Sequence, residues 1–147
     1  MPGSYWIDAQ RGIVFSRGWG AMSDGEIVAH AQDLGKDPRF RSTFRQVVDF
    51  RDLHEIQVTS EGVRTLAQVH PFHRQAHRAV VVASDAVFGL TRMFTLLADA
   101  DPEHFGIFRS LEPAMEWIGL PPETSWPDQA PDAVFRADTT AAPGAAG

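Results

Sequence analysis

The sequence predicts an α/β domain with a mixed, largely parallel β-sheet of about five strands and four helices, and two observations support this fold class. First, residues 79–83 are apolar, rich in β-branched valine and too few for a helix, so they indicate a buried strand. Second, Ser84 and Asp85 can cap a helix directly after this run. Apolar residues then recur at helical spacing at Val87, Leu90, Phe94 and Leu97. A strand that leads straight into an apolar helix is the repeating unit of α/β layer folds.

Composition restricts the classes of protein to which the chain can belong. With 147 residues, 44% of them hydrophobic and 22% charged, the chain is expected to form one soluble globular domain. The net charge of -6 argues against nucleic acid or an anionic membrane surface as the main partner. No apolar run approaches the roughly 18–20 residues that span a bilayer, and the first residues do not resemble a signal peptide. Because the chain has no cysteine, disulfides and thiolate chemistry are excluded, and we expect a cytoplasmic protein.

The first elements are predicted from residue alternation and from a helix-capping motif. Residues 5–8 and 12–17 are expected to form two short strands joined by a tight turn, and the glycines within residues 18–20 are expected to end the second strand. Ser23 and Glu26 have the spacing of a capping box, in which each side chain bonds to the backbone N–H of the other residue. The first helix should therefore begin directly after Ser23.

The middle of the chain predicts a further strand and helix. Residues 44–50 read FRQVVDF and indicate a strand, and residues 51–58 are expected to be a polar connection. Thr59 or Ser60 can cap the second helix. This helix should end or kink near His70, because the following Pro71 lacks the backbone N–H that a helix interior requires.

The last elements complete the order β-β-α-β-α-β-α-β-α. Residues 103–109 predict the final strand, and Ser110 is expected to cap a short fourth helix. Right-handed crossovers should place the helices mainly on one face of the sheet. Residues 1–120 therefore form the predicted domain. Residues 121–147 hold five of the ten prolines and are expected to be a mobile tail, from which Trp126 and Phe135 can dock on the domain.

Three stretches of the chain resemble the SpoIIAA-like (STAS/SEC14-related) family of small bacterial domains. They are VVDFRDL at residues 47–53, VVVASDAVFGLTRMF at residues 80–94 and IFRSLEPAMEWI at residues 107–118. The resemblance spans residues 5–120 and implies a fold similar to that of the anti-sigma-factor antagonists. In true antagonists the loop after the third strand carries Asp-Ser-Ser-Gly, in which a partner kinase phosphorylates a serine; here residues 58–62 read VTSEG.

The resemblance makes Thr59 and Ser60 candidate phospho-acceptors. A phosphate at a helix N-terminus is favoured by unpaired backbone N–H groups and by the helix dipole, and it would alter the binding of a partner through its charge. The alternative is an ordinary helix cap without modification. Glu55 and Glu61 would repel a phosphate here, which favours the helix cap.

Three histidines have a spacing that suggests a metal site. His70, His73 and His77 form H-x2-H-x3-H, which would place the imidazoles on one face of a helix. However, Pro71 interrupts the motif, and no cysteine or suitably spaced carboxylate accompanies it. We therefore interpret these residues as a polar surface connection, and we expect neither a metal nor a cofactor.

No motif in the sequence indicates catalysis. Residues 18–23 begin like the dinucleotide fingerprint G-x-G-x-x-G, but Ser23 replaces its third glycine, so the glycines are expected to serve a backbone turn. Asp49, Arg51 and Asp52 follow a strand, where open α/β sheets bind ligands, but such pairs are also structural ties between loops. A nucleophile elbow, a P-loop and paired catalytic carboxylates are all missing from the sequence.

The third helix carries more apolar surface than one buried face requires. Surplus apolar surface on a helix often marks an interface. The leading hypothesis is therefore a non-catalytic regulatory or protein-binding module that engages another protein or forms a homodimer. The alternative, which the SEC14 side of the resemblance implies, is a carrier of a small apolar or lipid-like ligand. The candidate interface or pocket residues are Phe88, Met93, Phe94, Leu96, Trp19 and Trp117.

Overall fold

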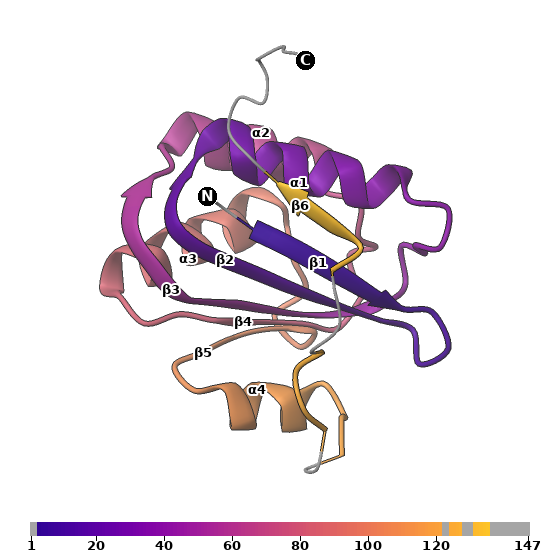
Figure 1. Ribbon diagram of the computed structural model, residues 1–147. Coiled ribbons are helices and arrows are strands. Elements are labelled where there is room, and N and C mark those ends of the chain that lie inside the picture. The colour runs from indigo at the N-terminus through magenta and orange to yellow at the C-terminus, as the bar shows by residue number, and fades with distance from the viewer. Residues whose placement is uncertain (1–2, 122–123, 128–130, 136–147) are drawn as a thin grey trace.

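The computed structural model describes residues 3–121, 124–127 and 131–135 and shows an α/β fold (Figure 1). A mostly parallel sheet is combined with four helices, which confirms the predicted fold class. The elements are, in chain order, β1 (Gly3–Asp8), β2 (Ile13–Ser23), α1 (Asp24–Lys36), β3 (Arg45–Gln57), α2 (Ser60–Val69), β4 (Arg78–Val81), α3 (Asp85–Leu97), β5 (Phe105–Phe108), α4 (Leu111–Trp117) and β6 (Ala133–Phe135). Among the described residues, no helix is long and apolar enough to cross a membrane.

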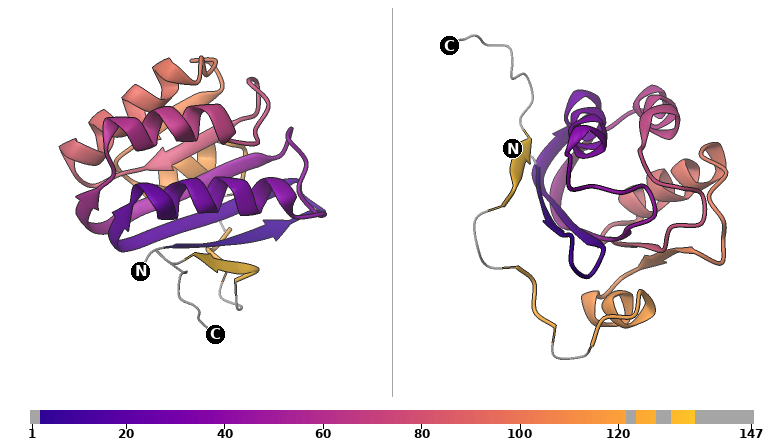
Figure 2. Two further views of the ribbon diagram at one scale, coloured as in Figure 1. Left: turned by 90° about the horizontal axis from the view of Figure 1, so that it is seen from above. Right: turned by 90° about the vertical axis from the view of Figure 1, so that its right-hand side faces the viewer.

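The sheet has the strand order β5-β4-β3-β2-β1-β6. Strands β2 to β5 run parallel to one another, whereas β1 is antiparallel to both β2 and β6. Helices α1, α2 and α3 each connect two neighbouring parallel strands and lie on one face of the sheet, while α4 lies on the other face (Figures 1 and 2). The predicted order of the first nine elements is confirmed, but the sheet has six strands instead of about five.

The sixth strand comes from the proline-rich segment for which the sequence predicts a mobile tail. Within this segment the structure describes residues 121, 124–127 and 131–135, and the remaining residues lie outside the described part of the chain. β6 pairs with β1, and the ring of Trp126 lies edge-on against Phe15, with centroids 5.4 Å apart. A strand of three residues has no periodicity that a sequence pattern can reveal, so the extra strand was not predicted.

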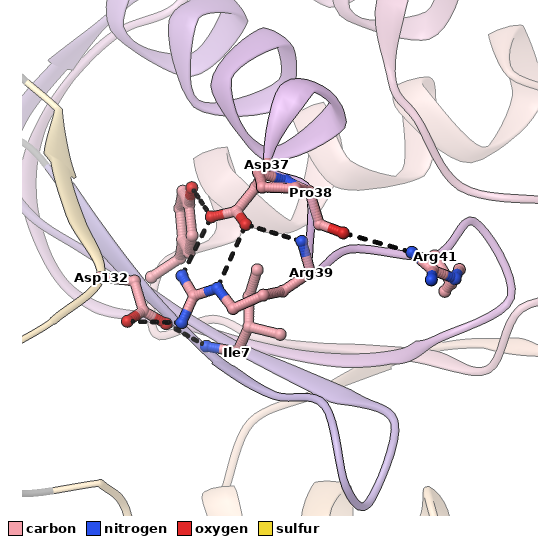
Figure 3. A network of polar contacts seen from close by, with 7 residues as sticks. Ile7, Asp37, Pro38, Arg39, Arg41 and Asp132 are labelled. Atoms are coloured by element: carbon pink, nitrogen blue, oxygen red, sulfur yellow. Dashed lines mark hydrogen bonds and ion pairs between the residues drawn. The ribbon is translucent and has the colours of Figure 1, made fainter.

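Polar contacts hold the start of β6 and the end of α1 against β1 (Figure 3). Asp132, directly before β6, accepts hydrogen bonds from the Ile7 N–H at 2.7 Å and from the Arg39 guanidinium at 3.0 Å. Arg39 also pairs with Asp37 at 3.0 Å, and the Tyr5 hydroxyl donates to the same carboxylate at 2.8 Å. The hydrogen bonds from Arg39 lower the pKa of Asp37 to about 2, so this carboxylate is ionised at neutral pH.

Strands β2 and β3 extend beyond their predicted ends. Residues 18–20 do not end β2, because two register shifts against β3 accommodate them. The predicted polar connection over residues 51–58 is wrong, because β3 continues to Gln57 and pairs in parallel with β2. In this extension most side chains are exposed, whereas Leu53 and Ile56 are half-buried on the helix-covered face. The longer strand therefore adds apolar side chains beneath the helices.

All four helices begin directly after residues that were predicted as caps. In the capping box of α1, the Ser23 N–H donates to Glu26 Oε1 at 2.8 Å and the Glu26 N–H donates to Ser23 Oγ at 3.4 Å. Ser84 caps α3 by accepting from the Val87 N–H at 3.2 Å. α4 likewise begins after Ser110, the predicted N-cap residue, although the Ser110 side chain makes no capping hydrogen bond.

The face of the sheet that α4 covers is a continuous apolar core. Successive strand residues alternate between the two faces, and every second residue of β2, β3 and β4 points toward α4. These side chains form one buried cluster with α4 and the residues after it: Ile13, Phe15, Val47, Ala79, Val81, Ala114, Met115, Ile118 and Leu120. The partly buried ring of Trp126 packs against the same cluster.

Candidate functional site

A cavity of about 110 Å³ lies between the sheet and the three helices of the opposite face. Helix α2 forms its roof and packs on α1 and α3. Two residues of α2, Gly62 and Val63, are buried. Natural cores are packed as densely as organic crystals, so unfilled space of this size between a sheet and its helices is unusual.

Most of the cavity wall is apolar. Residues two apart on β3 share a face of the sheet, so Val48 and Phe50 form the floor together with Val80 of β4. The helices contribute residues at three- and four-residue spacing, which places them on one face of each helix. These are Ile27, Ala31 and Leu34 of α1, Val63 and Leu66 of α2, and Val87, Leu90 and Phe94 of α3. An apolar wall with few polar groups is typical of small-molecule sites.

Arg78, the first residue of β4, brings a positive charge into this apolar wall. Its guanidinium lies over the rings of Phe72, Phe94 and Phe105, at 4.3, 5.3 and 5.2 Å from their centroids. The Nε–H donates to Oε1 of Gln46 at 3.0 Å. Burial lowers the pKa of Arg78 to about 9, so the guanidinium is charged at neutral pH. Within the described residues no carboxylate forms an ion pair with it.

A chain of hydrogen bonds holds Gln46 in place beneath Arg78. The Gln46 amide nitrogen donates to Ser16 Oγ at 3.0 Å, and Ser16 Oγ lies 3.1 Å from His30 Nε2. Because Ser16 accepts from Gln46, its own hydroxyl proton is free to bond to His30 Nε2. Burial lowers the pKa of His30 to about 4, helped by the charge of Arg78, so His30 is neutral and can accept that proton.

His70, the C-cap residue of α2, contributes a second polar group to the same end of the cavity. Its ring meets the ring of Phe94 edge-on at 5.4 Å, and Phe94 also lies under Arg78. Burial, with a smaller effect of Arg78, lowers the pKa of His70 to about 4. Its Nδ1 atom is buried without a hydrogen-bond partner among the residues that the structure describes. A buried polar atom without a partner is rare in native structures and calls for an explanation.

The structure does not gather the six predicted interface or pocket residues into one site. Phe94 lines the cavity, whereas Phe88 lies under the Arg109 guanidinium at 4.9 Å and does not line it. Trp117 belongs to α4, on the other face of the sheet, and Trp19 stacks under Arg17. The remaining two residues lie on α3, Met93 half-buried and Leu96 exposed.

Thr59 acts as the helix cap that was the alternative to a phospho-acceptor. Its hydroxyl donates to Asp24 Oδ2 at 2.5 Å and accepts from the Gly62 N–H at 3.2 Å. Its N–H donates to Asp24 Oδ1 at 2.7 Å. A phosphoryl group on Thr59 would face the Asp24 carboxylate and lose the cap. Ser60 is exposed at the first position of α2.

The three histidines of H-x2-H-x3-H are separated in space. His70 lines the cavity, His73 is exposed and accepts from the Gln75 N–H at 3.1 Å, and His77 stacks on His104 with centroids 4.6 Å apart. Within residues 3–121, 124–127 and 131–135, no group of three or more His, Asp or Glu side chains is arranged to hold a metal ion.

The acidic and basic cluster after residue 48 forms structural ties. Asp49 pairs with Arg51 at 2.9 Å, and Asp52 pairs with Arg17 of the neighbouring strand at 2.7 Å. None of these four side chains lines the cavity. The Arg17–Asp52 pair ties β2 to β3 at the surface, whereas the Asp49–Arg51 pair lies within β3.

The polar residues that mark the cavity were not predicted, although the sequence contains a signal for two of them. Gln46 is a polar residue within a valine-rich strand, and His30 lies beside the apolar stripe of α1. A polar side chain on a buried face must find a partner, so each position could have been marked as a candidate site. Arg78 stands at the start of its strand, where a charged residue is ordinarily solvated. Nothing in the sequence distinguishes it from an ordinary surface arginine.

Comparisons with known proteins do not name a family for this chain: no family model, no curated protein and no solved structure matches it. The resemblance to the SpoIIAA-like family therefore stays a prediction. Function has to be argued from the cavity and from the groups that line it.

Proposed function

We propose that the protein is a non-catalytic binding module that holds a small, largely apolar molecule between its sheet and the helices α1, α2 and α3. The cavity of about 110 Å³ with apolar walls and a polar end carries this proposal. An apolar cavity of roughly 150 Å³ holds a benzene molecule, so this smaller space suits a short aliphatic chain, and a longer chain has to extend along the open border.

The border of the cavity allows a ligand to enter. Several residues of its wall are partly exposed, so the cavity reaches the protein surface there. They are Leu53, Ile56, Val58, Leu66 and Leu90. A ligand longer than the cavity could therefore extend along this apolar border.

The polar groups favour binding over catalysis. Ser16 and His30 are hydrogen-bonded as a nucleophile and its base would be, but Ser16 is 1% exposed and does not line the cavity. A bound molecule would therefore not reach its hydroxyl. The role that the geometry supports for both residues is to hold Gln46 beneath Arg78.

Filling the cavity tests this function. Ala31→Leu adds three carbon atoms inside the cavity, and Ala29→Leu adds the same atoms to α1 at a position outside its wall. We expect octan-1-ol to bind the wild type and Ala29→Leu, measured by calorimetric titration, and to bind Ala31→Leu at least tenfold more weakly. Equal affinity for all three folded proteins, or no binding by any, would contradict the proposal.

Protein binding by the end of α3 is a second candidate function. Leu96 and Leu97 are adjacent and 75% and 46% exposed, which favours a contact with another protein or a second copy of the chain. Light scattering after size-exclusion chromatography tests it. A concentration-dependent dimer that Leu96→Glu abolishes is the expected result, and a monomer at all concentrations would exclude self-association.

A further inference from the structure

Arg78 is the feature of the cavity that apolar ligand binding does not explain. Arg78 is half-buried, and removing even part of an ion's surface from water is costly, so arginines in such places are ordinarily paired with a carboxylate. Here three phenylalanine rings and the Gln46 amide surround the guanidinium, and the described residues supply no counter-charge. The rings attract the cation, but they neither neutralise it nor accept hydrogen bonds in its plane.

The hydrogen bonds of Arg78 leave one edge of the guanidinium unused. Of its five N–H donors, the Nε–H bonds to Gln46, and no described residue accepts from the two terminal nitrogens. The cavity wall includes Arg78, so an acceptor that enters the cavity can meet this edge. The chain through Gln46, Ser16 and His30 and the stacked rings fix the orientation of the fork before any ligand arrives.

The unpaired Nδ1 of His70 lies at the same end of the cavity. His70 and Arg78 both contact the ring of Phe94. The centroids of the His70 and Phe94 rings lie 5.4 Å apart. The guanidinium carbon of Arg78 lies 5.3 Å from the Phe94 centroid. Because this Nδ1 atom has almost no accessible surface, an acceptor in the cavity does not reach it. The guanidinium of Arg78 is therefore the charged donor that this end of the cavity presents to a ligand.

The charge of the cavity selects the acceptor. Arg78 is the one charged side chain of the cavity wall, and the histidines beside it are neutral at pH 7. A carboxylate carries a single negative charge and matches the planar fork of arginine with two parallel hydrogen bonds. A phosphate monoester carries about -1.5 to -2 charges at this pH, which one arginine does not balance.

We infer that the cavity binds a small monocarboxylic acid, with its carboxylate on the unused edge of Arg78 and its apolar tail along Val48 and Val80 under α2. This inference rests on the proposed function and adds the chemical class of the ligand. The carboxylate supplies the counter-charge that the protein itself does not provide, and the tail fills the void.

A panel of equal chain length tests the inference on the intact protein. Octanoate, octan-1-ol, octylamine and octyl phosphate are titrated separately and followed by calorimetry. We expect octanoate to bind about 10- to 100-fold more tightly than octan-1-ol, the range for a hydrogen-bonded charge pair, and octylamine to bind most weakly. Octanoate no tighter than octan-1-ol would overturn the inference and leave the proposed function standing. If octyl phosphate bound most tightly, the inferred ligand would be a dianion and not a carboxylate. The absence of all binding would overturn both the inference and the proposed function.

Two variants separate the charge of Arg78 from its bulk. Arg78→Met keeps the length of the side chain without the charge, and Gln46→Glu keeps Arg78 but gives it a carboxylate partner within the protein. We expect each to bind octanoate and octan-1-ol with similar affinity. Arg92→Met, at an exposed position of α3, is the control and should keep the preference for octanoate. If Arg78→Met does not fold, Gln46→Glu still decides, and a preference for octanoate retained in Gln46→Glu would overturn the inference.

Discussion

The two faces of the sheet are built from alternate residues of the same strands, but they differ in how they pack. Toward α4, five strand residues are each at most 1% exposed and form one cluster: Ile13, Phe15, Val47, Ala79 and Val81. Toward α1, α2 and α3, the neighbours Gln46, Val48, Arg78 and Val80 border a cavity, and the apolar residues divide into two clusters. The α4 face is close-packed, whereas the face toward α1, α2 and α3 leaves the space in which we propose that a ligand binds.

The position of α2 explains why a cavity remains on the helix-covered face of the sheet. Near its start, a Cβ on Gly62 would lie 1.9 Å from Asp24 Oδ1, so α2 already touches α1 as closely as a glycine allows. Just beyond its end, Pro71 approaches Gly35 of α1, where a Cβ would lie 3.1 Å from the Pro71 Cβ. The roof is thus held close to α1 at both ends, and the cavity lies between the roof and the buried strand residues Val48 and Val80.

The largest expected effect is on the close-packed face. Phe15→Ala should lower the free energy of unfolding by about 3–5 kcal/mol, because the ring is buried among α4, Trp126 and the sheet. Chemical denaturation measures it, and Leu96→Ala, at a residue 75% exposed, should change stability by less than about 0.5 kcal/mol. A loss below 1 kcal/mol for Phe15→Ala would show that this face does not carry the stability of the domain.

On the cavity face, acid should destabilise the protein through His30. Its pKa is about 4 in the folded state, against 6.5 for the unperturbed group. Between these values the unfolded chain binds more protons, so stability is complete above about pH 6.5 and falls as the pH drops toward 4, by on the order of 3 kcal/mol. His70 shifts in the same direction.

Urea denaturation at pH 7 and pH 4.5 measures this dependence, with two glutamine variants for comparison. His30→Gln should reduce it by about half, because His70 keeps its own contribution, whereas His73→Gln, at an exposed residue, should leave it unchanged. Asp37 has a pKa of about 2, so its contribution to stability is lost at pH values below the range between pH 7 and pH 4.5. It therefore does not obscure the effect of His30. Identical pH dependence in the wild type and His30→Gln would mean that His30 is not buried neutral beside Gln46.

The smallest effect concerns the attachment of the roof. Gly62→Ala should destabilise the protein by about 1–3 kcal/mol and weaken binding of octan-1-ol, because the new methyl group pushes α2 away from Asp24. Gly89→Ala in α3 is the matched control, since a Cβ there meets nothing within 4 Å. It should stabilise the protein by about 0.5–1 kcal/mol through helix propensity. Equal effects of the two substitutions would remove the argument that α1 holds the roof.

Local patterns were enough to predict most of the fold. The capping box at Ser23 and the valine-rich run of residues 79–83 located elements whose start or burial depends on neighbours in the sequence. Local patterns did not predict the second half of β3. Its polar residues are exposed, and its pairing with β2 depends on residues more than 30 positions away. β6 was missed for the same reason, since it depends on a partner strand at the other end of the chain.

The candidate site was less predictable because its parts meet only in the folded chain. Phe72 lies in a loop, Phe94 in α3 and Phe105 in β5, and nothing in their spacing indicates that they surround one arginine. The sequence did suggest a small apolar ligand and included Phe94 among its contacts. It attributed the pocket to other aromatic residues, of which Trp117 lies across the sheet.

Chemical-shift mapping by NMR tests most directly whether one face of the sheet is the ligand site. The ¹⁵N-labelled protein is titrated with octanoate, and both backbone and arginine Nε signals are followed. We expect the largest changes at Val48, Val63, Phe94 and the Nε–H of Arg78, with Ala114 and Ile118 on the α4 face unaffected. Changes concentrated on α4, or no changes at millimolar octanoate, would contradict the assignment of the cavity face as the binding site.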